Sequence, residues 1–112
     1  MKKGKTFTKE CKGPQAPFEN IPESVDWVSV GAVTPVKNEG VCGAFYAFAT
    51  TGALEGAYYQ AKGSLLSFSE QQIIDCSWNF GNEGCKGGHV QWAFWYVIDH
   101  GITTETQYKY KG

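Results

Sequence analysis

The sequence lacks long apolar runs and lacks an excess of either charge. No stretch approaches the roughly 20 apolar residues that a membrane-spanning helix needs, so we expect no membrane association. The basic start at residues 2–5 is not followed by an apolar run, so we expect no signal peptide in this chain. Ten Lys and Arg against 11 Asp and Glu give a formal charge of −1. This balance argues against nucleic acid or an anionic membrane as a partner.

A metal-binding pattern is also missing, although four cysteines are present: Cys11, Cys42, Cys76 and Cys85. No two cysteines have C-x-x-C spacing, and both histidines follow the last cysteine, so we expect neither a metal nor a cofactor. Four cysteines allow three sets of disulfide pairs, and the residues alone do not select one. Disulfides imply an oxidising compartment. Because no export signal precedes these cysteines, we expect that the start of a longer protein is missing.

With 112 residues, the chain forms one domain at most. Residues 1–20 are polar and show no hydrophobic period, so we predict an extended or disordered arm there, a remnant of a prosegment or linker. The predicted globular part covers residues 21–112. Its 14 glycines and the 15% share of aromatic residues favour a loop-rich domain over a helical bundle.

The strongest helical pattern covers residues 44–61 and ends at Gly63, a natural C-cap. This segment is apolar on more than one face, so we predict that it is buried through much of its length. Gly52 and Gly56 each cost about 1 kcal/mol relative to alanine in a helix. We therefore expect another segment to pack closely against them.

Two shorter helices and several extended segments complete the prediction. Ser69 and Gln72 have the spacing of a capping box, which predicts a short helix ending near residue 76. A glycine-rich loop follows at residues 77–88, and a third helix fits residues 89–100. The short apolar stretches within residues 25–33 predict brief strands or extended loops.

Three motifs stand in order along the chain: residues 33–48 (VTPVKNEGVCGAFYAF), 66–76 (LSFSEQQIIDC) and 81–88 (GNEGCKGG). Their order and spacing resemble papain-like cysteine peptidases, especially cathepsin L, and residues 24–27 resemble the start of the mature enzyme. The resemblance covers about residues 21–110. It implies the α+β papain-like fold, truncated to the mainly α-helical left lobe. This lobe has a long central helix, two shorter helices and a glycine-rich loop tied by a disulfide.

The resemblance also shows where this sequence departs from a working enzyme. In the family, a cysteine nucleophile opens the central helix, and a glutamine six residues earlier donates to the oxyanion hole. Here Phe45 stands at the nucleophile position and Glu39 at the oxyanion-donor position, while Tyr46 replaces a tryptophan. The family's histidine and asparagine follow roughly 130–150 residues after the nucleophile, beyond the end of this chain. We therefore expect no catalytic residue and no peptidase activity.

Other positions take structural roles by resemblance. Cys42 matches the cysteine that bridges to the glycine-rich loop, at Cys85. The family partner of Cys76 lies just past the end of this chain, so Cys76 is either unpaired or joined to Cys11. Glu55 and Glu70 match framework residues rather than an acid–base pair. His100 stands beside the expected C-cap at Gly101, where a positive charge favours the helix dipole, so we predict a capping role rather than a catalytic one.

The remnant of the substrate cleft contains five residues by resemblance: Gly43, Gly87, Gly88, His89 and Val90. The alternative for His89 is a polar residue that only begins a helix. Three functions follow from these features. They are a pseudoenzyme lobe, a module that binds a papain-family second lobe or a peptide through its exposed interface, and a fragment of a member with an ancestral cysteine-type endopeptidase role in proteolysis. The family implies a secreted, lysosomal or vacuolar location.

Overall fold

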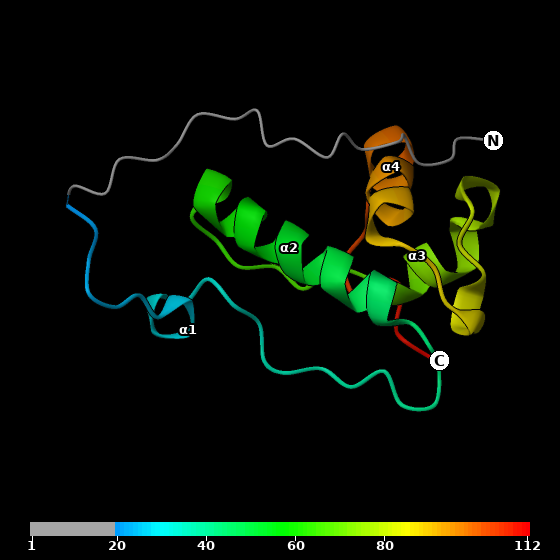
Figure 1. The fold of residues 1–112 in the computed structure, drawn as a ribbon, viewed down its shortest axis with the longest axis horizontal. Helices are drawn as coiled ribbons and strands as arrows, with labels where there is room; N and C mark the ends of the chain where they lie inside the picture. Colours follow the sequence, from blue (N-terminus) through cyan, green and yellow to red (C-terminus); the bar gives the residue numbers. More distant parts are fainter. Residues whose placement is uncertain (1–19) are drawn as a thin grey trace, which may run out of the picture.

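The computed structural model describes residues 20–112; the predicted arm, Cys11 included, lies outside the described residues apart from Asn20. Figure 1 shows a mainly helical arrangement, in agreement with the predicted lobe. Its elements are α1 (Trp27–Val30), α2 (Phe45–Lys62), α3 (Glu70–Cys76), the 3-10 turns η1 (Trp78–Phe80) and η2 (Gly84–Lys86), and α4 (Val90–His100). Within residues 20–112, strand-like pairing is limited to an isolated bridge between Phe68 and Thr104.

Helix α1 is a single helical turn, so the predicted strands or extended loops are wrong at residues 27–30. The Asp26 carboxylate accepts hydrogen bonds from Val28 N (3.1 Å) and Ser29 N (3.3 Å). Gly31, at φ 94°, ends the turn in the left-handed region. An N-cap aspartate therefore outweighs the β-branched character of the valines that follow it.

The long predicted helix is confirmed as α2, and Gly63 ends it with a hydrogen bond from its N–H to Tyr59 O (2.8 Å). Its burial is shorter than predicted. The buried side chains of α2 are Tyr46, Ala47, Thr50, Thr51 and Glu55. Figure 1 shows why: the last turns of α2 extend away from α3 and α4, so these helices cover only its first half.

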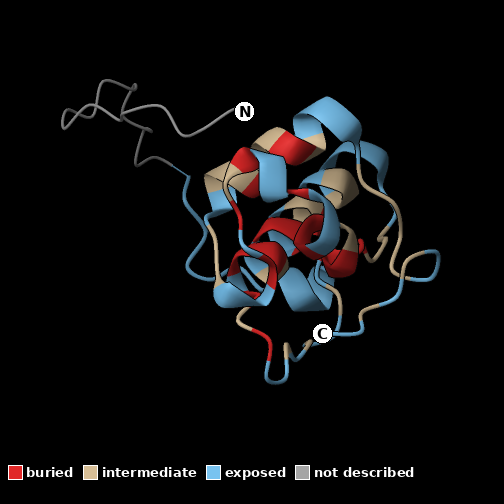
Figure 2. Cartoon of the chain, turned by 90° about the vertical axis from the view of Figure 1, so that its right-hand side faces the viewer, coloured by how far each residue is buried: buried red, intermediate tan, exposed pale blue. Residues whose placement is uncertain are grey.

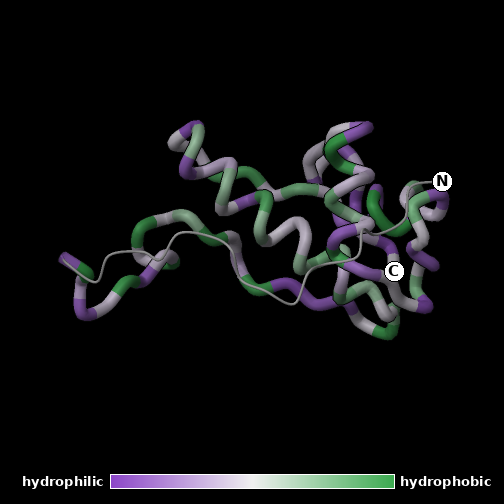
Figure 3. Tube along the Cα trace, turned by 45° about the horizontal axis from the view of Figure 1, so that its top comes forward, coloured by the Kyte–Doolittle hydropathy of each residue, from purple (hydrophilic) through white to green (hydrophobic). Residues whose placement is uncertain are grey.

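The expectation that a segment packs against the helical glycines is also wrong in this chain. No heavy atom outside the local backbone lies within 4 Å of the place where a Cβ would stand on Gly52 or Gly56. The segment before α2 runs beside this helix without reaching the two glycines, and Figure 3 marks the apolar residues along that segment. The two glycines therefore carry their helical cost without compensating contacts.

The hydrophobic core lies where α2, α3, η1 and α4 meet. Its buried members are Cys42, Ala44, Tyr46, Ala47, Ile73, Ile74, Phe80, Ala93 and Tyr96. Figure 2 shows the buried residues gathered on the facing sides of these helices, with exposed residues around them. The core fixes the start of α2 firmly against the rest of the lobe, and the candidate site lies at that start.

The predicted capping box of α3 is half present. The Ser69 hydroxyl accepts from Gln72 N (3.1 Å), as predicted for the N-cap. The Gln72 side chain does not return to Ser69; it accepts from Thr103 N (2.8 Å) and donates to the Tyr96 hydroxyl (3.0 Å). A tertiary contact with the segment after α4 therefore replaces the local one.

Helix α4 follows its prediction closely. It begins after His89 and ends at Gly101, whose N–H donates to Val97 O (2.7 Å). His100, in the last turn, stacks on Tyr96 with ring centroids 5.0 Å apart and meets Phe80 edge-on at 5.9 Å. The imidazole therefore packs against aromatic rings of the core as well as standing at the helix end.

Candidate functional site

Phe45 is the first residue of α2, at the position where the resemblance places the nucleophile. Its side chain is 59% exposed, and its ring meets Tyr46 edge-on at 5.9 Å. The N-terminus of a helix carries a partial positive charge that would stabilise a thiolate or another anion. Phenylalanine has no ionisable or nucleophilic atom that could use this field.

A disulfide between Cys42 and Cys85 ties the segment before α2 to the glycine-rich loop, which confirms the predicted pair. Beside it, Gly43 N donates to Cys85 O (2.9 Å). A Cβ on Gly43 would lie only 2.7 Å from that carbonyl oxygen, so the close approach requires glycine. Together, the disulfide and this contact hold the loop against the start of α2.

Of the predicted cleft residues, the structure places Gly87 beside Phe45, while Gly43 precedes it by two positions in the chain. A Cβ on Gly87 would lie 3.9 Å from the Phe45 ring, which places these two positions in contact range. Asn82 supports the same loop from within, because its Oδ1 accepts from His89 N (2.8 Å). A Cβ on Gly88 would lie 2.2 Å from the same oxygen, so a larger residue would displace Asn82. The role of these residues as a cleft remains a prediction.

His89 and Val90 occupy the junction between the loop and α4. The His89 ring meets Trp92 edge-on with centroids 4.4 Å apart, and Val90 is 38% exposed as the first residue of the helix. His89 is the N-cap of α4, but its side chain makes no capping hydrogen bond. Its ring therefore packs on the aromatic surface of α4.

Glu39 lies near Phe45, since both residues line a cavity of about 510 Å³ between α2 and the segment before it. The backbone carbonyl of Glu39 accepts a hydrogen bond from the Tyr110 hydroxyl. An ionised carboxylate has acceptors only, so the Glu39 side chain offers no donor to a developing oxyanion. Glu39 and Phe45, the positions at which the resemblance predicts a replacement, thus line one shared cavity.

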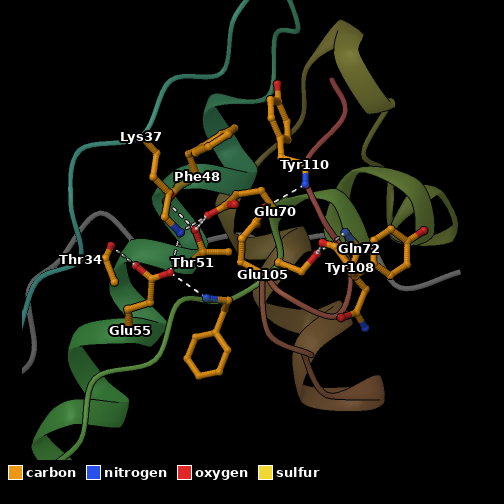
Figure 4. A network of polar contacts seen from close by, with 12 residues as sticks. Thr34, Lys37, Phe48, Thr51, Glu55, Glu70, Gln72, Glu105, Tyr108 and Tyr110 are labelled. Carbon is orange, nitrogen blue, oxygen red and sulfur yellow. Dashed lines mark hydrogen bonds and ion pairs between the residues drawn. The ribbon is translucent and has the colours of Figure 1, made fainter.

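An ion-pair network under this space was not predicted from the sequence. Lys37 Nζ contacts Glu55 Oε2 at 2.7 Å and Glu70 Oε2 at 2.6 Å, and both carboxylates are almost fully buried (Figure 4). Further donors are Thr34 Oγ1 (2.8 Å) and Phe68 N (2.9 Å) on Glu55, and Thr51 Oγ1 (2.6 Å) on Glu70. The two carboxylates are thus satisfied within the framework, as befits structural residues. The sequence did contain one signal for this network: Glu55 lies in an otherwise apolar helical stretch, and a buried glutamate needs a cationic partner.

The same network governs the protonation of Lys37. Burial lowers the pKa of the ammonium group, whereas its hydrogen bonds to Glu55 and Glu70 and their charges raise it. The balance lies above the ordinary pKa of lysine. Lys37 is therefore firmly cationic and holds the segment before α2 to both α2 and α3.

Tyr46, at the position of the family's tryptophan, anchors the glycine-rich loop. Its hydroxyl is buried and donates to Gly84 O (2.7 Å). Burial, followed by the charge of Asp75, raises the pKa of Tyr46 to about 12. The hydroxyl therefore stays protonated at any physiological pH and keeps its hydrogen bond.

Cys76 is the last residue of α3 and is exposed, with no disulfide to any residue within 20–112. Its pairing with Cys11 stays open, because Cys11 lies outside the described residues. In the same part of the chain, His, Cys, Asp and Glu side chains form no group of three or more suited to a metal ion. No helix in this range is long and apolar enough to cross a bilayer.

Comparison with known families settles the ancestry of this arrangement. The family model described as papain family cysteine protease matches residues 21–112. The chain belongs to the papain family. A cathepsin L-like protein of Caenorhabditis elegans is 50% identical over 99 residues, which cover 87% of this chain and 29% of that protein. Cathepsin L of Sarcophaga peregrina is 52% identical over 93 residues, covering 82% of this chain and 27% of that protein.

Solved papain-family structures have the same fold over the matched region. Digestive procathepsin L 3 of Tenebrio molitor superposes with a TM-score of 0.76 at 46% identity, covering 83% of this chain and 31% of that one. The Amb a 11 cysteine protease of ragweed pollen, in its proform, gives 0.78 at 49% identity, covering 83% and 29%. The chain therefore spans less than a third of the length of these four relatives.

Proposed function

We propose that this papain-family chain is a catalytically inactive lobe, a pseudoenzyme derived from a cysteine peptidase. The observation that carries the proposal is Phe45 at the first position of α2, exposed and without a nucleophilic atom. No neighbouring base can activate a phenyl ring. Glu39, on the same cavity, adds negative charge where an oxyanion would develop.

Neither remaining cysteine in the described region replaces the missing nucleophile. The sulfur of Cys42 is held in the disulfide with Cys85. Cys76 is the last residue of α3, so it does not stand at a helix N-terminus, the position that the family's nucleophile occupies by resemblance. Within residues 20–112, neither cysteine therefore stands where the family's nucleophile would.

The test is a turnover assay of the purified full chain with a fluorogenic dipeptide substrate, with and without a thiol-reactive epoxide. We expect no cleavage above the rate of a buffer control. Cleavage that the epoxide blocks would overturn the proposal, because it would require a working thiolate. If no cleavage is found, the resemblance to cathepsin L reflects only the evolutionary origin of this chain. The endopeptidase role in proteolysis would then not extend to it.

We also infer a second function, in which the lobe binds a protein partner. Two cavities of about 510 and 400 Å³ share Thr34, Gly52 and Glu55 and so form one groove along α2, here called the α2 groove. Gly52 and Gly56 lie in its lining without any contact from another segment. Glycines that leave a helix backbone open suit a partner that approaches it closely.

The partner we infer is the complementary lobe of a papain-family peptidase. The segment before α2 exposes five large apolar side chains, two of which, Trp27 and Val33, line the α2 groove; the others are Val28, Val30 and Val36. Such apolar surface favours association with a protein over solvent. The matched region is less than a third of the relatives named above, so most of a family fold lies outside it. We infer that the part of a relative that this chain does not match is the partner, because in the relatives that part and the matched region belong to the same protein.

Calorimetric titration of the full chain with the separately produced remainder of an intact relative tests this function. We expect saturable binding to the wild-type chain and at least tenfold weaker binding to Gly52→Leu, whose side chain fills the groove. Leu is a good helix former, so this variant keeps α2 intact. Lack of binding to the wild-type chain, or equal binding to the variant, would contradict the proposal.

The compartment follows from the same chemistry. We infer that the chain resides in an oxidising environment, secreted or within lysosomes or vacuoles. Support comes from the Cys42–Cys85 disulfide, since such bonds are rare in reducing compartments. Retention of this disulfide in protein isolated under thiol-blocking conditions would support the inference, and a fully reduced pair would contradict it.

A further inference from the structure

Glu105, in the segment after α4, has a carboxylate oxygen without a partner. Its Oε2 accepts from Tyr110 N (2.8 Å), whereas its Oε1 is buried and has no hydrogen-bond partner. A buried acceptor without a donor is destabilising, and the cost is larger when the acceptor is charged. Within residues 20–112, Glu105 is the one carboxylate with such an unpartnered buried oxygen.

The charged groups around Glu105 come from several elements. Glu70 on α3 and Lys37 from the segment before α2 stand in the same network as Glu105 (Figure 4), and both act on the Glu105 carboxyl group, Glu70 through a hydrogen bond and its charge and Lys37 through its charge. Glu55 on α2 binds the same lysine. The network thus holds three carboxyl groups and a single ammonium group, which contacts Glu55 and Glu70 directly (Figure 4).

The electrostatic balance at Glu105 favours its neutral form. Burial is the largest effect and raises the pKa of the carboxyl group. The hydrogen bond from the Tyr110 backbone and the charge of Lys37 lower it, whereas the hydrogen bond and charge of Glu70 raise it. The pKa lies above the ordinary value of glutamic acid as a result.

We propose that Glu105 and Glu70 share one proton at acidic pH, and that this proton clamps the segment after α4 onto α3. The proton resides on Glu105 and is donated to the Glu70 carboxylate. It supplies the donor that the pair otherwise lacks and removes the repulsion between two carboxylates. As the pH rises, this proton is lost to solvent, and the clamp opens.

The clamp has consequences beyond the two carboxylates. Residues 105–112 are held by Glu105 N on Ser67 O (2.9 Å) and by two amides at residues 111 and 112 on Gln71 Oε1 (2.7 and 3.1 Å). The Tyr110 hydroxyl in the same segment binds the Glu39 carbonyl. Opening of the clamp therefore loosens the loop that lines the cavity beside Phe45.

The direction of the pH effect follows from proton linkage. The pKa of Glu105 in the folded chain exceeds its unfolded value of about 4.3, so the folded state binds the proton more tightly. The clamp is therefore at full strength below the unfolded pKa. Its contribution is lost as the pH rises through the folded pKa.

Hydrogen exchange of the Tyr110, Lys111 and Gly112 amides in the full chain tests the clamp. Rates between pH 4.5 and 7.5 are corrected for intrinsic exchange and compared with those of Glu105→Gln. In this variant, the amide donates to Glu70 at every pH, and its oxygen still accepts from Tyr110 N. In the wild type, we expect the protection of these amides to fall as the pH rises through the folded pKa of Glu105. The total fall should be about tenfold for each unit by which the folded pKa exceeds the unfolded pKa. Protection in the variant should stay flat with pH.

The matched control is Glu83→Gln, which neutralises an exposed carboxylate in the glycine-rich loop. It should retain the pH dependence of the wild type. Constant protection in the wild type, or the same fall in Glu105→Gln, would overturn the proposal. A carbon-13 titration of the Glu105 carboxyl in the wild type needs no variant. Titration at or below the ordinary pKa of glutamic acid would overturn it as well.

Discussion

At the scale of single residues, the chemistry of this lobe depends on what stands at the start of α2. Phe45 occupies a position that the core holds firmly, because Ala44, Tyr46 and Ala47 on either side of it are buried. The start of α2 is thus held in place by its buried neighbours, while the side chain of residue 45 itself is exposed. A single substitution should therefore restore thiol chemistry without restoring catalysis.

Phe45→Cys tests this separation. The new thiol lies at the N-terminus of α2, where the helix field lowers its pKa. We expect it to react with iodoacetamide several-fold faster than Cys76 at neutral pH, as followed by mass spectrometry. Phe45→Ser provides the control for any change in the exposure of Cys76. Equal rates at the two thiols would contradict the expectation that the N-terminus of α2 lowers the pKa of a thiol at residue 45.

Lys37 is the residue whose loss should harm folding most. Lys37→Met keeps the length of the side chain but leaves Glu55 and Glu70 buried without their cation, which costs about 3 kcal/mol. The free energy of unfolding in urea measures this loss. Lys62→Met, at the exposed end of α2, should change it by less than about 0.5 kcal/mol. Similar effects of both variants would contradict a structural role for the network.

At the scale of elements, the sequence predicted helices whose ends carry their own signals. Ser69, Gly63 and Gly101 cap α3, α2 and α4 through local hydrogen bonds, so short-range patterns were sufficient. The turn of α1 was missed because β-branched residues there outweighed the Asp26 cap in the pattern. The diversion of Gln72 to Thr103 depends on residues 31 positions apart, which no local rule contains.

The open face of α2 yields a prediction at this scale. Gly56→Ala should stabilise the full chain by about 0.5–1 kcal/mol, because the added Cβ meets nothing within 4 Å and alanine is the better helix former. Thermal unfolding followed by far-ultraviolet circular dichroism measures the change. Gly43→Ala is the opposite control, since its Cβ would clash with Cys85 O. Destabilisation by Gly56→Ala would mean that another segment does contact this face.

At the scale of the whole molecule, the Cys42–Cys85 disulfide and a small hydrophobic core hold the described part of the lobe, residues 20–112, together. The Cys42–Cys85 pair and the adjacent Gly43 were recognised from motif order, and the structure brings both beside Phe45. The Lys37 network and the Glu105 contacts were not predicted. They join four separate segments, so they arise only from the folded arrangement.

Reduction of the disulfide should therefore destabilise the lobe substantially. The two cysteines are separated by 43 positions in the sequence. For a loop of this size, the chain-entropy model predicts that reduction lowers the free energy of unfolding by about 3–4 kcal/mol. Near-ultraviolet circular dichroism of the aromatic core during a thermal melt, with and without reductant, measures it. Cys42→Ala with Cys85→Ala reproduces the reduced state without reductant. Identical melts of oxidised and reduced chain would contradict this role of the bond.

The hydrogen bond from Tyr110 to the Glu39 carbonyl spans 71 positions and closes the described chain into a ring of contacts. Through this bond, the residues around Tyr110 support the loop that contains Glu39. A proteolytic cut between Tyr108 and Tyr110 would leave the helices and the disulfide intact, but it would remove the support of the loop between Lys37 and Cys42. Damage at one end of the chain would thus appear as lost order at the other.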